Sequence, residues 1–233
     1  EGGNYTTVNG VLTNSGTAIV AVPHAVERVD FASTEFSNTT TLMRGAFNAS
    51  SVEVVDLSLL TASVEIGQEC FGDMANLTTL KLPNALKNSI DGALTKGLVN
   101  LTTITGGDGT SAYVENNVLY TNSSKTNLVK VGVGQKTLSS ETTTTLGQFA
   151  LEGAKLETIE LTATDLSVTT GMFDSFKDTL KYVTLGVSTL QDAQFKDFEK
   201  LITAKFTNTS LSQIPTSCFE NCSNLTNVVS SAK

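Results

Sequence analysis

The sequence predicts a β-rich α/β solenoid, a right-handed coil of about seven to eight turns of roughly 22–24 residues that contains two β-hairpin segments. Three observations predict this fold. Phenylalanine returns at a nearly fixed interval, a short apolar pattern follows each return, and two copies of a hairpin pattern interrupt the series. A period in the low twenties is typical of chains in which each turn repeats one small structural unit.

The first observation is the interval between the apolar anchor residues. The successive steps are 24, 23, 55, 24, 22 and 24 residues, and the anchors are Phe47, Phe71, Leu94, Phe149, Phe173, Phe195 and Phe219. We expect the six aromatic anchors to stack as a column of rings with a one-ring gap at Leu94. Each buried ring should stabilise the fold by about 1.5–3 kcal/mol. Scattered phenylalanines in an ordinary β-sandwich would not recur together with a second aligned motif.

The second observation is a leucine pattern about six residues after each anchor. Its period of two predicts a short strand whose apolar side chains point inward. The strands are expected within residues 77–82, 101–104, 156–161, 180–185, 201–206 and 225–228, with earlier equivalents at Val26, Val29 and Phe31 and at Val52, Val55 and Leu57. Between strand and anchor, single apolar residues should close the convex side of the coil, namely Ile66, Val168, Leu190 and Ile214.

The third observation is a duplicated hairpin. Val8–Val22 and Val114–Val131 each have an apolar run, a polar turn and a second apolar run. The predicted order is therefore hairpin 5–22, repeats 26–105, hairpin 112–131 and repeats 133–229, in a single continuous domain over 1–233. We expect each hairpin to join the solenoid edge. Because solenoids need capped ends and none follows the last strand, we also expect the chain to be a fragment of a longer one.

The L-x-x-L-x-L strand pattern is that of a leucine-rich repeat. Gly45-Ala46-Phe47, Ile66-Gly67 before Cys70-Phe71, and Cys218-Phe219 before Asn221-Cys222 and Leu225 resemble the BspA-type leucine-rich repeat family. Val118-Leu119-Tyr120 is similar to an insertion found in that family. The resemblance covers nearly the whole chain, with two departures: Leu94 replaces the aromatic anchor, and Gly147-Gln148-Phe149 shortens the convex segment.

The resemblance implies a protein secreted from, or displayed on, the surface of a host-associated bacterium or parasitic protist. It also implies adhesion, either to extracellular host proteins such as fibronectin and fibrinogen or to other microbial cells. These implications come from the family and not from the periodicity.

The charge of the chain limits its partners. The net charge is −8 and the pI is about 4.7, so no basic patch is expected for nucleic acid. No apolar run is long enough to span a bilayer. Nine Asn-x-Ser/Thr sequons could carry glycans in a eukaryotic secretory pathway, although three of them recur at one repeat position and reflect the consensus. They are Asn4, Asn38, Asn48, Asn76, Asn100, Asn122, Asn208, Asn221 and Asn224.

Residues for catalysis or cofactor binding are scarce, so we expect no enzyme, no cofactor and no metal. His24 is the single histidine and is expected to be exposed or locally bonded. The three cysteines, Cys70, Cys218 and Cys222, read as buried free thiols, with a Cys218–Cys222 bridge as the alternative. Gly106-Gly107-Asp108-Gly109 resembles a fragment of a calcium loop and is expected to form a turn.

The best candidate binding surface is the concave face of the strand stack. The residues flanking each central leucine should point to this face, and they are Thr79, Lys81, Thr103, Thr105, Thr158, Glu160, Tyr182, Thr184, Thr203 and Lys205. Threonine here is also explained by its strand preference and by cross-strand contacts. Tyr182 is the residue typical of an interface anchor.

Three functions are compatible with such a face. The leading hypothesis is an adhesion module that binds an extracellular host protein. A structural spacer within a larger surface protein and a glycan-binding module are the alternatives. The spacer would have no ligand to lose on mutation, and glycan binding is disfavoured by the lack of further aromatic residues along the row.

Overall fold

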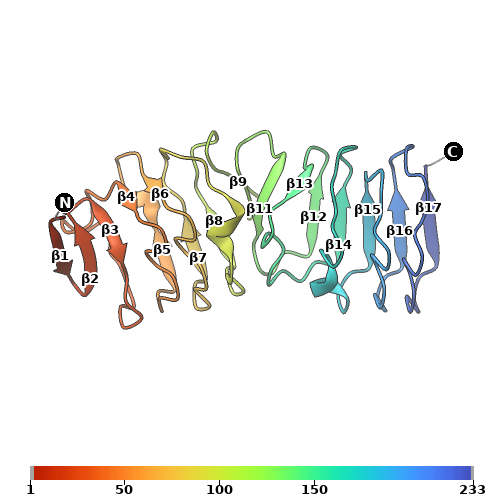
Figure 1. Cartoon of the computed structure of the whole chain (residues 1–233), viewed down its shortest axis with the longest axis horizontal. Helices are drawn as coiled ribbons and strands as arrows, with labels where there is room; N and C mark the ends of the chain where they lie inside the picture. The colour runs from red at the N-terminus through yellow and green to blue at the C-terminus, as the bar shows by residue number, and fades with distance from the viewer. Residues whose placement is uncertain (1–2, 232–233) are drawn as a thin grey trace.

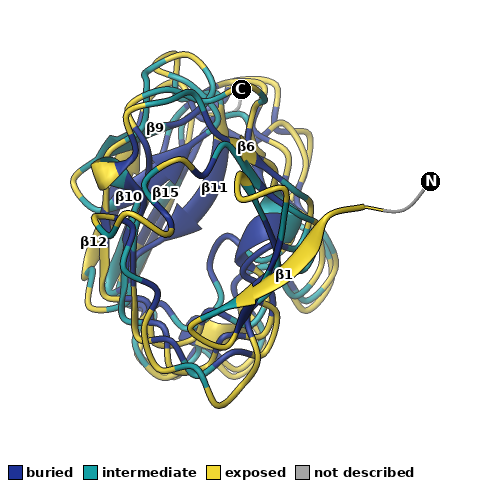
Figure 2. Cartoon of the chain, turned by 90° about the vertical axis from the view of Figure 1, so that its left-hand side faces the viewer, coloured by how far each residue is buried: buried dark blue, intermediate teal, exposed yellow. Residues whose placement is uncertain are grey.

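The computed structural model describes residues 3–231, and the four terminal residues of the predicted domain lie outside this range. The chain forms a β-solenoid of about nine turns stacked along one long axis (Figure 1). Viewed along that axis, the turns form a closed outline with buried segments on the inside (Figure 2). The predicted solenoid is therefore confirmed, with slightly more turns than the leucine pattern indicated.

Parallel ladders formed by the leucine strands run along the solenoid. We call them the repeat ladders, and each pairs one strand per turn in register. The N-terminal repeat ladder contains β5 (Val54–Asp56), β7 (Thr79–Lys81) and β8 (Thr103–Thr105). The C-terminal repeat ladder contains β12 (Thr137–Ser140), β14 (Thr158–Leu161), β15 (Tyr182–Leu185), β16 (Thr203–Phe206) and β17 (Asn227–Ser230).

Two further sheets contain the hairpins. The first has the order β1 (Tyr5–Val8), β2 (Val11–Asn14), β3 (Ala18–Ala21), β4 (Thr41–Leu42) and β6 (Glu65–Ile66). The second has the order β9 (Tyr113–Glu115), β10 (Val118–Tyr120), β11 (Asn127–Val131) and β13 (Thr145–Leu146). In both, three antiparallel strands end in a parallel pairing with a two-residue strand, β3 with β4 and β11 with β13. The duplicated hairpin and its attachment to the solenoid edge are thus confirmed.

Helix is limited to three 3-10 segments among residues 3–231: η1 (Leu57–Leu59), η2 (Gly92–Thr95) and η3 (Asp174–Phe176). The convex segments are otherwise successive tight turns, such as the Ala46 N–H to Met43 C=O and Asn48 N–H to Gly45 C=O bonds. Gly45 and Ala49, which flank the Phe47 turn, have φ values of 64° and 54°. Left-handed residues four positions apart interrupt any α-helix, so the helical part of the predicted α/β class is only 3-10.

The aromatic column is present but shorter than predicted. The Phe47 and Phe71 ring centroids are 5.6 Å apart. Farther along, Phe195 stacks on Phe173 and on Phe219 at 5.8 Å in each case, with interplanar angles of 5° and 9°. The predicted one-ring gap is therefore wrong, because several turns without an aromatic anchor separate the two stacks.

The predicted anchors Leu94 and Phe149 are also wrong. In the turns of Phe47, Phe71, Phe195 and Phe219 a left-handed residue lies two positions after the anchor, and the corresponding residues here are Gly97 and Gly153. Thr95 and Leu151 therefore occupy the anchor position. The Thr95 side chain is fully buried and its hydroxyl donates to the Val129 C=O at 3.3 Å. Phe149 is only half-buried, because it lies two residues before the position that faces the interior.

Three of the four residues predicted to close the convex side of the coil are buried. Ile66, Val168 and Leu190 are buried, with exposed fractions of 4%, 6% and 7%. Ile214 is 44% exposed, so the prediction is wrong for this residue. It lies in the last described turn, where no further turn packs over it within residues 3–231.

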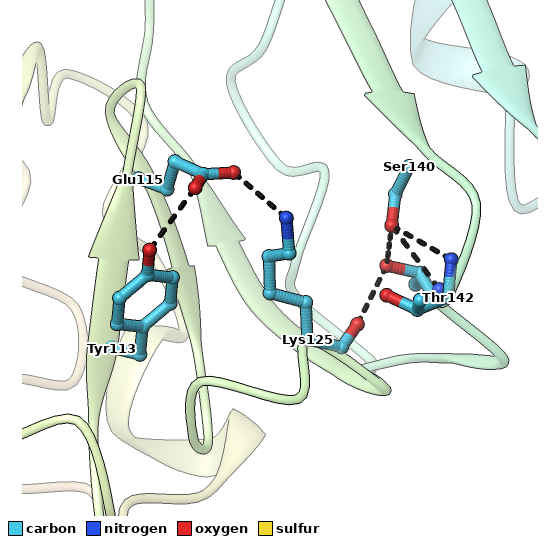
Figure 3. A network of polar contacts seen from close by, with 6 residues as sticks. Tyr113, Glu115, Lys125, Ser140 and Thr142 are labelled. Carbon is cyan, nitrogen blue, oxygen red and sulfur yellow. Dashed lines mark hydrogen bonds and ion pairs between the residues drawn. The ribbon is translucent and has the colours of Figure 1, made fainter.

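The second hairpin separates two hydrophobic cores. Because side chains alternate across a strand, Leu119 and Val129 join the core that contains the Phe47 stack, whereas Val118, Tyr120 and Leu128 join the core of the Phe173 stack. A polar network attaches this hairpin to the following turn (Figure 3). In that network Lys125 contacts the Glu115 carboxylate at 3.0 Å, and the Thr143 hydroxyl donates to the Lys125 C=O at 2.8 Å.

Lys130 on β11 is a buried charged residue beside the second core. Its side chain is fully buried, and its Nζ donates to the C=O of Glu152 at 2.7 Å and of Phe149 at 3.4 Å. Burial lowers the pKa of Lys130 from 10.5 to about 8, an effect that the negative charge of Glu152 partly offsets. The equivalent residue of the first hairpin is Ala21, so the lysine is specific to the second copy.

Candidate functional site

The ten predicted face residues all lie on the solvent side of the repeat ladders. None of them is buried, and they alternate along their strands with buried Leu80, Ile104, Ile159, Val183 and Ala204. The alternation follows from the pleat of a strand, which sends successive side chains to opposite faces. We refer to this surface as the ladder face.

The ladder face is divided into two patches. Thr79, Lys81, Thr103 and Thr105 lie on β7 and β8, and the other six residues lie on β14, β15 and β16. Within each patch the residues form rows across paired strands. Thr158, Tyr182 and Thr203 make one row, and Glu160, Thr184 and Lys205 make the next. Sheet pairing does not join β8 to β12, so the structure does not bring the two patches into one continuous ladder.

Sequence reasoning missed six residues of the same rows. Val54 and Asp56 of β5 extend the first patch; Thr137 and Ser139 of β12 and Asn227 and Val229 of β17 extend the second. The β12 strand lacks the leading leucine of the repeat. The alternation of Thr137 and Ser139 with buried Leu138 was the signal that could have identified it.

The charges on the ladder face differ in their availability. Lys81 forms an ion pair with Asp56 at 2.7 Å. Burial opposes ionisation of Asp56, but hydrogen bonds from Lys81 and Ser58 outweigh it and lower the pKa of this carboxyl. Lys205 has no ion-pair partner among residues 3–231. Tyr182, which is 46% exposed, and Lys205, which is also exposed, are therefore available to a partner.

Side-chain amides close two interrupted ladder edges. Asn117 Oδ1 accepts a hydrogen bond from the Ile104 N–H at 2.7 Å, and its Nδ2 donates to the Thr102 C=O at 2.8 Å. Asn88 contacts the Ile66 N–H at 3.1 Å and the Ile66 C=O at 2.9 Å. Each amide thus presents the donor and acceptor that a neighbouring peptide group would present. A Cβ on Gly132 would overlap the Asn117 amide, which explains the glycine there.

A pocket of about 730 Å³ lies where the first repeat ladder begins. Its walls are the extended segment 27–31 on one side and residues 51–56 with Leu59 on the other. His24 is exposed and its Nε2 lies 3.1 Å from the hydroxyl of Ser51, a wall residue. This agrees with the expectation of a locally bonded histidine.

The predicted turn at Gly106–Gly109 is confirmed by the bonds of Asp108. One of its carboxylate oxygens accepts from the N–H groups of Thr110, Ser111 and Ala112, and the other accepts from the Leu86 N–H. Burial opposes ionisation, but these four backbone donors outweigh it and lower the pKa of Asp108. The carboxylate therefore organises the loop.

All three cysteines are free, so the alternative of a Cys218–Cys222 bridge is not realised. Burial raises the pKa of the Cys70 thiol to about 12 and that of Cys218 to about 11. The Cys222 thiol, which is half-buried, donates to the Phe195 C=O at 2.9 Å. Cys70 and Cys218 behave as small apolar core residues.

The repeated sequon asparagines have structural contacts. The Asn100 amide donates to the Ala75 C=O at 2.9 Å and the Asn224 amide donates to the Glu199 C=O at 2.6 Å. These bonds link each turn to the one before it. Asn208 is buried and bonds the C=O groups of Thr164 and Gly186.

Two other features are absent from the described part of the chain. Residues 3–231 contain no group of three or more histidine, cysteine or acidic side chains arranged to hold a metal ion. Over the same range, no helix has the length and apolar character needed to cross a membrane.

Comparison with solved structures finds several bacterial proteins of similar fold. A leucine-rich repeat protein from Eubacterium ventriosum is 17% identical, with 97% of this chain and 82% of that chain covered and a TM-score of 0.42. The pneumococcal vaccine antigen PcpA is 15% identical, with 85% and 61% covered and a TM-score of 0.48. A leucine-rich cell surface protein from Faecalibacterium prausnitzii is 14% identical, with 100% and 94% covered and a TM-score of 0.33.

Comparison with curated proteins finds no match. The profile of the BspA type leucine rich repeat region matches in six copies, over residues 28–126 and 144–233. The interval between these ranges contains β11 of the second hairpin and β12. The match covers well over half of the chain. The protein therefore belongs to the BspA-type leucine-rich repeat family.

Proposed function

We propose that this protein is a secreted or surface-displayed, non-enzymatic interaction module that adheres to an extracellular host protein through its ladder face. Fibronectin and fibrinogen are the partners to test first. The observation that carries the proposal is the pair of exposed rows on β14, β15 and β16, with Tyr182 exposed between Thr158 and Thr203. Family membership and the acidic net charge agree with a protein-binding role outside the cell.

The chemistry of the second patch suits a protein partner. Tyr182 offers an apolar ring with a hydroxyl, which is the residue type enriched at interface anchors. Lys205 is a cation with no ion-pair partner in the described chain and lies two strands from Glu160, so the patch can bind mixed charges. Because Lys81 is already paired with Asp56, the first patch should contribute less than the second.

The test is binding of the isolated chain to immobilised fibronectin and fibrinogen. We expect saturable binding at micromolar concentration, weakened at least about tenfold by the combined changes Tyr182→Ala, Lys205→Ala and Lys81→Ala, which corresponds to about 1.4 kcal/mol. Lys200→Ala, which changes an exposed lysine outside the ladder face, is the matched control. Absence of a saturable signal for the unmodified chain would count against both host proteins and favour the spacer role. A positive carbohydrate array would favour glycan binding instead.

A further inference from the structure

The regular turns follow one rule for starting a ladder strand. Two successive N–H groups donate to a single C=O of the preceding turn. Thr78 and Thr79 donate to the Glu53 C=O at 2.9 and 3.2 Å, and Thr102 and Thr103 donate to the Thr78 C=O at 2.9 and 3.0 Å. The same arrangement recurs at β14, β15, β16 and β17. This pair of bonds locks each strand against the one before it.

The rule fails at β5. By the same register, the N–H groups of Glu53 and Val54 should donate to the Glu27 C=O, but neither has a hydrogen-bond acceptor within residues 3–231. Segment 28–31 nevertheless lies in the strand position of its turn, because Val29 and Phe31 are buried in the core. The backbone of that segment has therefore separated from β5 while its side chains remain packed.

The edge of β5 that has no strand partner within residues 3–231 faces the gap between β5 and segment 28–31. Since the Glu53 C=O bonds β7, the alternating pleat directs the N–H and C=O of Val54 and the N–H of Asp56 away from β7. These groups face segment 28–31 across the pocket of about 730 Å³. Its volume lies within the range of roughly 300–1,000 Å³ that ligand pockets occupy.

The molecule itself shows what closes such an edge. At β8 and at β6, the amides of Asn117 and Asn88 supply the missing donor and acceptor. At β5 no side chain in the described range does so. We propose that this pocket receives an extended, basic peptide of a partner protein, which adds to the edge of β5 as a further strand.

The charges around the pocket specify the partner. Four carboxylates line it, and two of them are already paired, Asp30 with Arg28 and Asp56 with Lys81. The other two, Glu27 and Glu53, have no ion-pair partner among residues 3–231. An incoming strand with lysine or arginine on one face would neutralise them.

The other face of such a strand would be apolar. Val54 and Leu59 are 48% and 47% exposed at the pocket, which is unusual for large aliphatic side chains in this fold. Because side chains alternate along a strand, a sequence that alternates basic and aliphatic residues could meet the carboxylates and these two side chains at once. This pocket is distinct from the rows on β14, β15 and β16, so the inference does not depend on the adhesion proposal.

The probe is an acetylated and amidated heptapeptide of alternating lysine and valine, titrated into the full chain at low salt. We expect saturable one-to-one binding below about 1 mM, weakening as salt is added. The amide protons of Val54 and Asp56 should exchange rapidly in the free protein and become protected in the complex. The same peptide with a methylated backbone nitrogen at alternate positions should bind at least about tenfold more weakly, because it lacks those donors.

Val54→Pro is the decisive variant. Proline removes an N–H that makes no bond in the fold, and proline is tolerated on a strand edge that faces solvent. We expect it to weaken the peptide at least about tenfold, whereas Val54→Ala, which keeps the N–H, should bind within about twofold of the unmodified chain. If Val54→Pro does not fold, the pair Glu27→Gln and Glu53→Gln gives an independent test, with lower affinity and a reduced salt dependence expected.

Several outcomes would overturn the inference. One is the absence of saturable heptapeptide binding up to about 1 mM, and another is equal heptapeptide affinity for Val54→Pro and Val54→Ala. A third is protection of the Val54 amide only in a concentration-dependent dimer, which would place a second copy of the chain in the pocket. A variant with only Tyr182 and Lys205 replaced, which leaves the Lys81–Asp56 pair at the pocket intact, should bind the heptapeptide normally. Loss of heptapeptide binding in that variant would place the peptide on the rows of β14, β15 and β16 instead.

Discussion

Replacing Lys130 with methionine should change how the stability of the protein depends on pH. The Lys130 ammonium is fully buried, bonds two backbone C=O groups, and forms no ion pair within residues 3–231. Methionine has a similar length and no charge. The substitution therefore removes the titrating group while leaving the Glu152 C=O without its lysine donor, which carries a pH-independent cost; the Phe149 C=O still accepts from the Glu152 N–H.

The magnitude follows from linkage. The pKa of Lys130 is lowered from 10.5 to about 8 by burial, so the folded state holds its proton less tightly than the unfolded state. Below pH 8 both states are protonated and the penalty of a buried charge is complete. As the pH rises the folded state releases its proton first, so stability increases. The gain is about 2 kcal/mol between about pH 7 and about pH 9.5, and about 3 kcal/mol once both states are neutral.

The assay is urea unfolding of the unmodified chain, Lys130→Met and Lys200→Met at a series of pH values. Differences between variants cancel the titration of the other groups. The free energy of unfolding of the unmodified chain should rise relative to Lys130→Met by about 2 kcal/mol over that interval, whereas Lys200→Met, at an exposed position, should follow the unmodified chain. A difference between the unmodified chain and Lys130→Met that does not vary with pH would refute the reasoning.

Three further predictions concern the core and the loops. Phe195→Ala should lower the free energy of unfolding by about 3–5 kcal/mol because it empties the centre of a ring stack, and Phe149→Ala should cost much less. Equal losses in urea unfolding would contradict the anchor assignment. Asn117→Gly keeps the left-handed backbone but removes the amide, and should cost about 1–3 kcal/mol. Faster exchange of the Ile104 amide should accompany that loss, and unchanged exchange would contradict the edge-closing role. Because the folded pKa of Asp108 lies below its ordinary value, its contribution should be complete above that value and should be lost as the pH falls through the folded pKa. Asp108→Asn should therefore flatten acid unfolding, and an unchanged acid profile would exclude this contribution.

The repeat could be recognised in the sequence because the residues that each turn buries recur at a fixed spacing. Each turn must place its leucines and its anchor inward, so spacing alone located most strands, both hairpins and the ladder face. The two misplaced anchors were one and two residues from the true positions. Leu94 and Phe149 are the more apolar residues, but the backbone directs Thr95 and Leu151 inward, and the Thr95 hydroxyl donates to the distant Val129 C=O as well as to the nearby Gly92 C=O. A contact of that kind is not visible in a local pattern.

The breaks in the ladder could not be anticipated either. Asn117 lies in a turn and shares its residue type with many turn residues, yet its amide replaces a strand. The separation of segment 28–31 from β5 occurs although Val29 and Phe31 fit the repeat pattern. Side-chain periodicity reports what faces the core, whereas these features depend on where backbone groups find partners.

The closure of β8 by Asn117 affects how the solenoid would respond to mechanical tension. Ladder bonds connect stacked turns, so the junctions between turns are loaded in series by a pull along the long axis, and each junction bears the same force. The regular turns resist with paired backbone bonds, whereas the junction between β8 and β12 relies on one amide and a few isolated contacts such as the Val133 N–H to Leu101 C=O bond. Stretching should therefore part the molecule there first. Each half would keep its own packed interior, so a pulled chain would lengthen in a discrete step before either half unravels.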